Sequence, residues 1–211
     1  MRMKSSAFGR WIGALVLCAI VVALCVQFVD RPVATFANAH WAAKNSLATL
    51  LDLVLLFVPL GALTILGCGC TVLAGRSLPR LAEATMLAGF SLMWTLASTA
   101  YLLKPAFGRI EIATYLAHSD LYGFKPFHGN SNSGFPSGHL AIAASFLLVF
   151  WIFYPRARIL IGAVIGALMI GLVLATWHFV SDVVGGLFVG ATAAEMTIAL
   201  FRADRHDTTV T

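Results

Sequence analysis

The chain has 211 residues, of which 60% are hydrophobic and 11% are charged, and its formal net charge is +5. Soluble domains usually hold about 25% charged residues, so this composition excludes an ordinary water-soluble fold and indicates an integral membrane protein. The positive charge is spread over separate connections and forms no single patch, which argues against a nucleic-acid partner.

Six apolar stretches are long enough to cross a bilayer as helices, which takes about 20 residues each. In chain order they cover 11–29, 47–74, 84–103, 139–154, 158–177 and 182–201. Because they use most of the chain, the sequence predicts an all-α, polytopic membrane protein. We expect a six-transmembrane-helix bundle that forms one membrane-embedded domain over residues 1–211.

Basic residues mark every second connection between these stretches. They precede the first stretch and follow the second, fourth and sixth: Arg2, Lys4, Arg10, Arg76, Arg80, Arg156, Arg158, Arg202 and Arg205. Cytoplasmic loops carry such an excess, so both termini are predicted to be cytoplasmic in a multi-pass protein of the inner (cytoplasmic) membrane. The connections 30–46, 104–138 and 178–181 then face the periplasm or exterior.

The first stretch also has features of a secretory leader, with a basic start and "ANA" at 37–39. The preceding "DRPVATF" is long for a cleavage region, so we expect the first stretch to remain as a span. The segment 40–52, "HWAAKNSLATLLD", is predicted to form a short interfacial helix that enters the second span.

Small residues favour close helix packing in the last two stretches. Gly162 and Gly166 form a G-x-x-x-G pair in the fifth, and Gly185, Gly186 and Gly190 line the sixth. All four cysteines lie inside apolar stretches and are expected to pack there, without a disulfide or metal role: Cys18, Cys25, Cys68 and Cys70.

Three polar motifs border the predicted non-cytoplasmic side. "KPAFGR" (104–109) opens the long connection 104–138, "FPSGH" (135–139) closes it, and "HFVSD" (178–182) separates the last two stretches. Loops of this length between elements are usually functional. The topology therefore predicts that the three motifs face one compartment and meet in one site.

The residue types in these motifs suit phosphoryl transfer. Lys104 and Arg109 supply cations for phosphate oxygens, and a helix that begins near Ser137 would aim unpaired N–H groups at an anion. His178 and Asp182 are four residues apart, so on a helix they would share a face, where the carboxylate orients the imidazole. His139 would be a second imidazole, free to act as general acid.

These motifs, in this order, resemble those of the type-2 phosphatidic acid phosphatase superfamily over about residues 100–190. The resemblance implies a six-span lipid phosphatase without a metal or other cofactor. It also implies that His178 attacks phosphorus and forms a phosphohistidine, that Asp182 orients it, and that His139 protonates the leaving group. Phosphate binding would fall to Lys104, Arg109, Ser137 and Gly138.

The chain departs from the family pattern at two cationic positions. Glu111 and Ile112 stand where the first motif has Arg-Pro, and Gly171 and Leu172 stand where the third has Ser-Arg. Arg109 is expected to take over as the phosphate arginine. We also expect Lys125 or His128, the remaining cations of the long connection, to supply part of the missing charge.

The predicted function is therefore hydrolysis of a phosphate monoester or diphosphate from a membrane lipid on the non-cytoplasmic face, with the lipid and the bilayer as partners. A rhomboid-like intramembrane serine protease using Ser137 and His178 remains an alternative, as does a non-catalytic protein that binds or transports lipid phosphates. A zinc site built from His128, His139, His178 and Asp182 is a further alternative, although its spacing matches no local motif.

Overall fold

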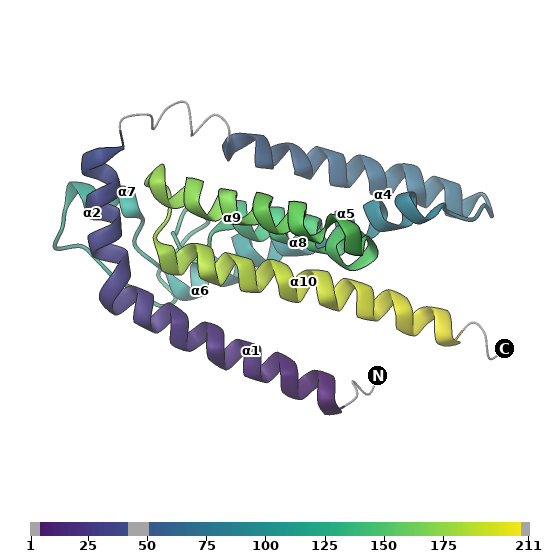
Figure 1. Ribbon diagram of the computed structural model, residues 1–211, viewed down its shortest axis with the longest axis horizontal. Helices are drawn as coiled ribbons and strands as arrows, with labels where there is room; N and C mark the ends of the chain where they lie inside the picture. The colour runs from purple at the N-terminus through teal and green to yellow at the C-terminus, as the bar shows by residue number, and fades with distance from the viewer. Residues whose placement is uncertain (1–4, 42–50, 208–211) are drawn as a thin grey trace.

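The computed structural model describes residues 5–41 and 51–207 of the chain (Figure 1). In these ranges it is helical, with an isolated antiparallel bridge between Arg109 and Phe124. Five described helical segments are long and apolar enough to cross a membrane, and a shorter apolar helix covers residues 138–153. The predicted all-α, multi-pass fold is confirmed.

Helices occupy the predicted apolar stretches, and shorter helices lie in the predicted connections 30–46 and 104–138. They are α1 (Ser5–Leu24), α2 (Asp30–His40), α4 (Phe57–Leu73), α5 (Arg80–Ser98), α6 (Lys104–Phe107), α7 (Ile112–Ala117), α8 (Gly138–Phe153), α9 (Arg158–Leu174) and α10 (Val180–Asp207). Short 3₁₀ turns, Leu53–Leu56 and Pro155–Ala157, precede α4 and α9. Most of the predicted interfacial helix at 40–52 lies outside the described residues.

Two π-helical turns make helices continuous at points where the sequence analysis predicts the end of a span. Cys25–Val29 links α1 to α2, and Thr99–Leu103 links α5 to α6. The prediction that a connection begins at residue 30 is therefore wrong, because the first helix continues to His40. Pro32 does not end it, since it falls in the first turn of α2, where a missing N–H is tolerated.

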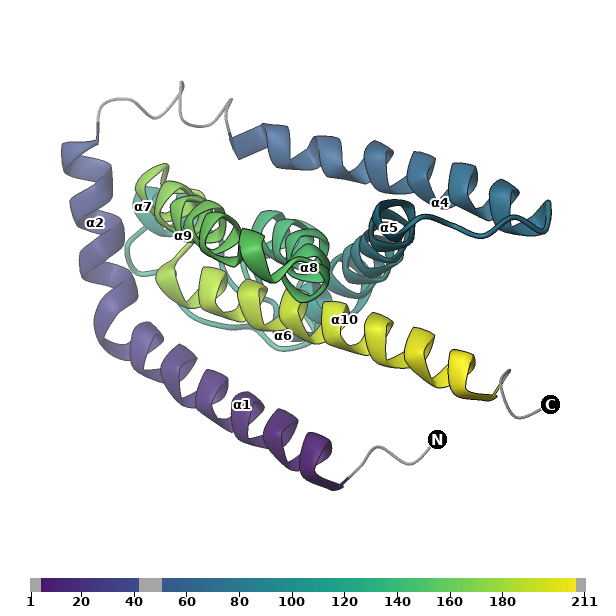
Figure 2. The ribbon, with the colours of Figure 1, turned by 45° about the vertical axis from the view of Figure 1, so that its right-hand side comes forward.

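Helix α8 lies at the centre of the bundle. Residues 140–146 are all buried, and the helix packs against α5, α9 and α10. The start of α1 and the end of α10 lie at one end of the molecule, whereas α2 turns across the opposite end (Figures 1 and 2). There α2 packs through Ala34 on Ile112 and Tyr115 of α7 and on Phe179.

Glycines set the distance between α8 and α10. A Cβ atom at Gly186 would lie 2.6 Å from the carbonyl oxygen of Ser137, and one at Gly190 would lie 2.6 Å from that of Ala141. By contrast, a Cβ at Gly166 of α9 would meet nothing within 4 Å. The sixth-span glycines thus make the close helix contact, and they bring the start of α10 against the start of α8.

Candidate active site

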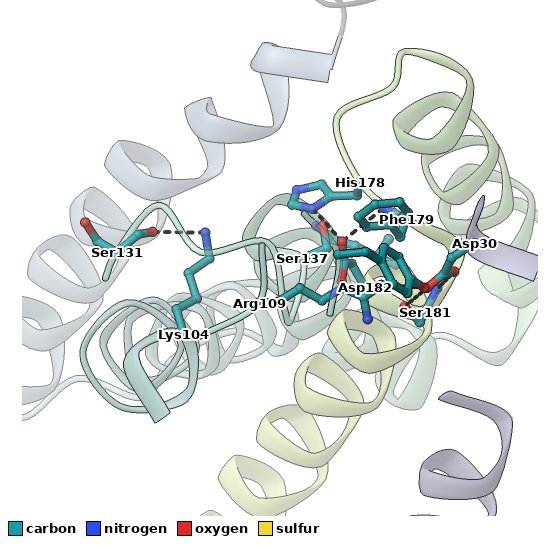
Figure 3. A network of polar contacts seen from close by, with 11 residues as sticks. Asp30, Lys104, Arg109, Ser131, Ser137, His178, Phe179, Ser181 and Asp182 are labelled. Carbon is teal, nitrogen blue, oxygen red and sulfur yellow. Dashed lines mark hydrogen bonds and ion pairs between the residues drawn. The ribbon is translucent and has the colours of Figure 1, made fainter. Parts of the chain in front are cut away.

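The end of the third span presents a lysine to the site. After the π-helical turn, Lys104 begins α6, and its Nζ donates a hydrogen bond to the carbonyl oxygen of Ser131 at 3.0 Å (Figure 3). The helix ends at Gly108, whose φ of 56° is left-handed. A side chain at Gly108 would collide with the main chain of Lys125, so this glycine lets the loop close over Lys104.

The start of α8 is an open helix N-terminus. Ser137 is its N-cap, and its Oγ accepts a hydrogen bond from the N–H of Leu140 at 3.4 Å. The first N–H groups of a helix have no partner within it. The Lys104 ammonium lies close by, since a Cβ at Gly138 would be 3.9 Å from its Nζ. A cation and a helix N-terminus therefore meet at one point, which suits an anion.

The turn after α9 holds His178. The N–H of Trp177 donates to the carbonyl oxygen of Leu172, and that of Thr176 donates to Val173, which is the hydrogen-bond pattern of a Schellman motif. Thr176 occupies the left-handed position of the motif with φ 56°. The N–H of His178 also donates to Leu172, at 3.3 Å. Leu172, where the family pattern has arginine, thus anchors His178 through its main chain.

His178 and Asp182 meet, although they do not share a helix as predicted. Helix α10 begins at Val180, so His178 precedes it, and its Nδ1 lies 3.7 Å from Oδ2 of Asp182. The same Oδ2 accepts a hydrogen bond from the N–H of Phe179 at 3.0 Å, as the third-position carboxylate of a capping box does. The hydrogen bond from Phe179 fixes the position of the Asp182 carboxylate, and this carboxylate faces Nδ1 of the His178 ring.

The two histidines face each other across the site. The ring centroids of His139 and His178 are 6.2 Å apart, and His139 also packs against Trp177 at 5.1 Å. Ser137 ties the two halves together, because its N–H donates to the carbonyl oxygen of Asp182 at 3.0 Å. The structure thus brings together the predicted His139, His178, Asp182, Ser137 and Lys104, which come from three separate motifs.

Arg109 lies behind Asp182 and is almost fully buried. Its Nη2 donates to Oδ2 of Asp30 at 2.8 Å, and its Nε lies 3.5 Å from Oδ1 of Asp182. The guanidinium also faces the rings of Phe124 and Phe179 at 4.6 and 4.7 Å, in cation–π geometry. A phosphate contact by Arg109, as predicted from the sequence, would require the guanidinium to leave these two carboxylates.

Asp30 is the main residue that the sequence analysis missed. It is 1% exposed, and it accepts hydrogen bonds from the N–H and the hydroxyl of Ser181 at 2.9 and 2.5 Å as well as from Arg109. The available signal was an acidic residue directly after the first apolar stretch, 11–29, within the helix 8–40, since acidic residues in such helices are usually functional. Figure 3 shows Asp30, Arg109, Ser181 and Asp182 side by side.

Tyr122 completes this buried cluster. Its hydroxyl donates to the carbonyl oxygen of Val26 at 2.7 Å and lies 3.3 Å from both Asp30 and Arg109. Burial, followed by the negative charge of Asp30, raises the pKa of Tyr122 to about 12. The phenol therefore stays protonated at neutral pH and acts as a donor in the cluster.

The other cations of the long connection lie at its surface. The side chains of Lys125 and His128 are exposed, and Nδ1 of His128 lies 2.8 Å from the carbonyl oxygen of Pro126. Glu111, at the first departure from the family pattern, is also exposed and precedes α7. A role for Lys125 or His128 in phosphate binding stays a prediction.

The described residues contain no group of three or more His, Cys, Asp or Glu side chains placed to hold a metal ion. His139, His178 and Asp182 therefore do not form a cluster of the kind that the zinc alternative needs within the described part of the chain.

The fold and the site define a polytopic membrane protein with paired histidines beside a helix N-terminus. The model of the PAP2 superfamily matches residues 84–205. The chain belongs to the PAP2 superfamily, the type-2 phosphatidic acid phosphatases, which confirms the resemblance seen in the sequence. Asp30 lies outside the matched segment.

Two curated relatives share about a third of their aligned residues with the chain. A lipid A 1-phosphatase of Rhizobium johnstonii is 34% identical over 105 residues, which cover 48% of this chain and 42% of that protein. A lipid A 1-phosphatase of Rhizobium etli is 31% identical over 105 residues, covering 48% and 44%. The matched segment thus spans less than half the length of either relative.

A solved structure shares the fold. The transmembrane PAP2-type phosphatidylglycerolphosphate phosphatase from Bacillus subtilis superposes with a TM-score of 0.55 over 92% of this chain and 96% of that one. Its sequence identity is 16%, so the match concerns the arrangement of the helices. It extends the similarity to the part of the chain that precedes residue 84.

Proposed function

We propose that the protein hydrolyses a phosphate monoester or diphosphate of a membrane lipid, with His178 as nucleophile. The observation that carries the proposal is the meeting of His178, His139 and Lys104 at the N-terminus of α8. Family membership supports it, since the curated relatives are phosphatases. The rhomboid-like alternative loses its basis, because it rested on the span number and two residue types alone.

The geometry favours one ring nitrogen of His178 for attack. Asp182 lies beside Nδ1, so Nε2 is left to carry the reactive lone pair, and the carboxylate holds the proton on Nδ1. In the first step Nε2 bonds to phosphorus, the bond from phosphorus to the lipid oxygen breaks, and His139 gives its proton to that oxygen. In the second step water gives a proton to His139 and displaces Nε2, which releases inorganic phosphate.

Positive groups around the phosphate would stabilise the charge that develops in these steps. Lys104 lies close to the start of α8, and we assign it, with the N–H of Gly138 and the hydroxyl of Ser137, to phosphate binding. Lys125 and His128 are the candidates for further charge from the adjoining loop. The proposal uses no metal ion.

An apolar cavity beside the site supports a lipid substrate. It has a volume of about 570 Å³ and is lined by α1, by Phe107, Phe124 and Phe135, by Pro136 before α8 and by Gly185 of α10. Pro136 directly precedes the α8 N-cap, so an acyl chain in this cavity would place its phosphate near Ser137. The named relatives make lipid A phosphates the first lipids to test.

The test is phosphate release by purified protein in mixed micelles, with a metal chelator present. The panel comprises lipid A phosphates, phosphatidic acid, phosphatidylglycerophosphate and a polyprenyl diphosphate, and His178→Gln is the inactive control. We expect release from at least one lipid and a loss of roughly 10⁴-fold or more in the control, as for other nucleophiles. Lipid binding without any release would instead support the binding-protein alternative.

We also infer that the site faces away from the cytoplasm in an inner-membrane protein with both termini inside. Arg80 and Arg202 line one pocket, and the start of α1 and the end of α10, which carry basic residues, lie at the end of the bundle opposite α2. In sealed vesicles of known orientation, an impermeant thiol reagent should label Asn132→Cys and Arg156→Cys from opposite sides. Labelling of Asn132→Cys from the cytoplasmic side would contradict this orientation.

A further inference from the structure

Two buried carboxylates share one arginine behind the proposed nucleophile. Arg109 bridges Asp30 and Asp182 at 2.8 and 3.5 Å, and all three side chains are at most 1% exposed. Asp30 comes from the N-terminal helix, Arg109 from the loop after α6, and Asp182 from α10. A line of charged contacts therefore runs from Asp30 through Arg109 to Asp182 and on to His178.

A second route connects Asp30 to the same carboxylate. Oδ1 of Asp30 accepts from the N–H of Ser181, in the first turn of α10, and Oδ2 accepts from its hydroxyl. Free N–H groups in a first helical turn favour a negative partner. Because Ser181 directly precedes Asp182, Asp30 fixes the backbone that carries Asp182 as well as the arginine that faces it.

The buried charges of Asp30, Arg109 and Asp182 indicate how the contacts through Arg109 and Ser181 would affect the reaction at His178. Nε and Nη1 of Arg109 and Oδ1 of Asp182 are buried without a hydrogen bond in the described residues. If Asp30 were neutral, Arg109 would have Asp182 as its one remaining carboxylate contact in the described part of the chain. The guanidinium would then draw Asp182 toward itself and away from the Nδ1 of His178, which lies 3.7 Å from the other oxygen.

We propose that Asp30 is a positioning residue for the His178–Asp182 pair, acting through Arg109 and Ser181. It holds the guanidinium back from Asp182 and leaves that carboxylate available to the histidine. This inference rests on the proposed hydrolysis, and it assigns a role in that reaction to the N-terminal helix, which lies outside the family match at 84–205.

The test compares steady-state kinetics of purified variants with their thermal unfolding in the same detergent. Asp30→Asn can still accept hydrogen bonds from Ser181 but lacks the charge, so kcat should fall about 10²-fold, the size expected for a small misplacement of a reacting group. KM should stay within about twofold, because the phosphate-binding groups are untouched. Asp30→Glu keeps the charge and should recover at least tenfold of the lost kcat.

Two control variants distinguish a role of Asp30 in positioning the His178–Asp182 pair from a role only in packing α2 against the bundle. Ala37 is 1% exposed and lies two turns beyond Asp30 on α2, so Ala37→Leu should loosen the helix without touching the ion pairs. At an equal loss of Tm it should lower kcat far less than Asp30→Asn does. Arg156→Gln changes an exposed charge in the turn between α8 and α9 and should leave kcat unchanged.

The double variant Asp30→Asn/Arg109→Met removes the guanidinium together with the charge of Asp30, and its Tm should stay below that of the wild type because Asp182 is left without a cation. The inference requires that its kcat exceed that of Asp30→Asn, because no guanidinium then draws Asp182 away from His178. It is overturned if the double variant is no more active than Asp30→Asn, if Ala37→Leu matches Asp30→Asn, or if Asp30→Asn is fully active. Absence of phosphate release by the wild-type protein would instead overturn the proposed function.

Discussion

The two sides of Asp182 are built in opposite ways. Toward His178, His139 and Lys104, the contacts are few and long, with 3.7 Å between the carboxylate and the histidine and 6.2 Å between the two rings. On the opposite side, Asp30 holds Arg109 and Ser181 through buried hydrogen bonds of 2.5 to 2.9 Å, and Arg109 in turn lies 3.5 Å from Asp182. The difference indicates that the groups left for substrate are those with spare bonding capacity, while the groups behind them are fixed by the protein.

We call the side of Asp182 that holds His178, His139 and Lys104 the open side, and the side that holds Asp30, Arg109 and Ser181 the closed side. The largest expected loss of activity on the open side comes from His139→Ala. Removing a general acid costs roughly 10²- to 10⁴-fold in rate, so kcat on the lipid substrate should fall by this amount. The loss should be much smaller with p-nitrophenyl phosphate, because its leaving group needs no proton. Tm should change little. An equal loss of kcat on both substrates would remove His139 from the protonation step.

On the closed side, Arg109→Met should act on stability first. Losing one partner of a buried ion pair costs about 3–5 kcal/mol, and here two carboxylates are left unpaired, so the free energy of unfolding should fall by at least that range. Arg158→Met, an exposed arginine, is the matched control and should cost under about 0.5 kcal/mol. If the two variants unfold alike, the buried cluster does not stabilise the fold.

The smallest effect is expected where both sides meet, between α8 and α10. Gly190→Ala would place a Cβ 2.6 Å from the carbonyl oxygen of Ala141, and overpacking of this kind costs about 1–3 kcal/mol. Gly166→Ala, which meets nothing within 4 Å, should be neutral or stabilising by up to about 1 kcal/mol. Chemical denaturation of both variants measures the difference, and equal stabilities would argue against a close α8–α10 contact.

The spans and the open side of the site were predictable from the sequence for local reasons. Apolar stretches of bilayer length predicted the helices, and Pro136 and Ser137 predicted the start of α8, which begins at Gly138. The alternation of basic connections predicted that the three motifs would face one side. These signals lie within short segments and need no knowledge of packing.

The closed side was not predictable in the same way. Asp30 meets Arg109 and Ser181 across 79 and 151 residues, and no local pattern specifies such pairs. The inward direction of Arg109 depends on the pairing of its strand-like segment with Phe124 and on the rings around it. His178 was expected on a helix with Asp182, but the Schellman turn at Thr176 places it just before the helix.

Asp30 directly follows the π-helical turn at Cys25–Val29, and it is synthesised well before Arg109 and Ser181, the two residues that it binds. At about 5–20 residues per second, the 151 residues between Asp30 and Ser181 take roughly 8–30 s to synthesise. During that time the first helix carries an acidic group without its buried partners, which is costly in a bilayer. The hydrogen bonds of Asp30 to Ser181 can therefore form only after the start of the last helix has been synthesised.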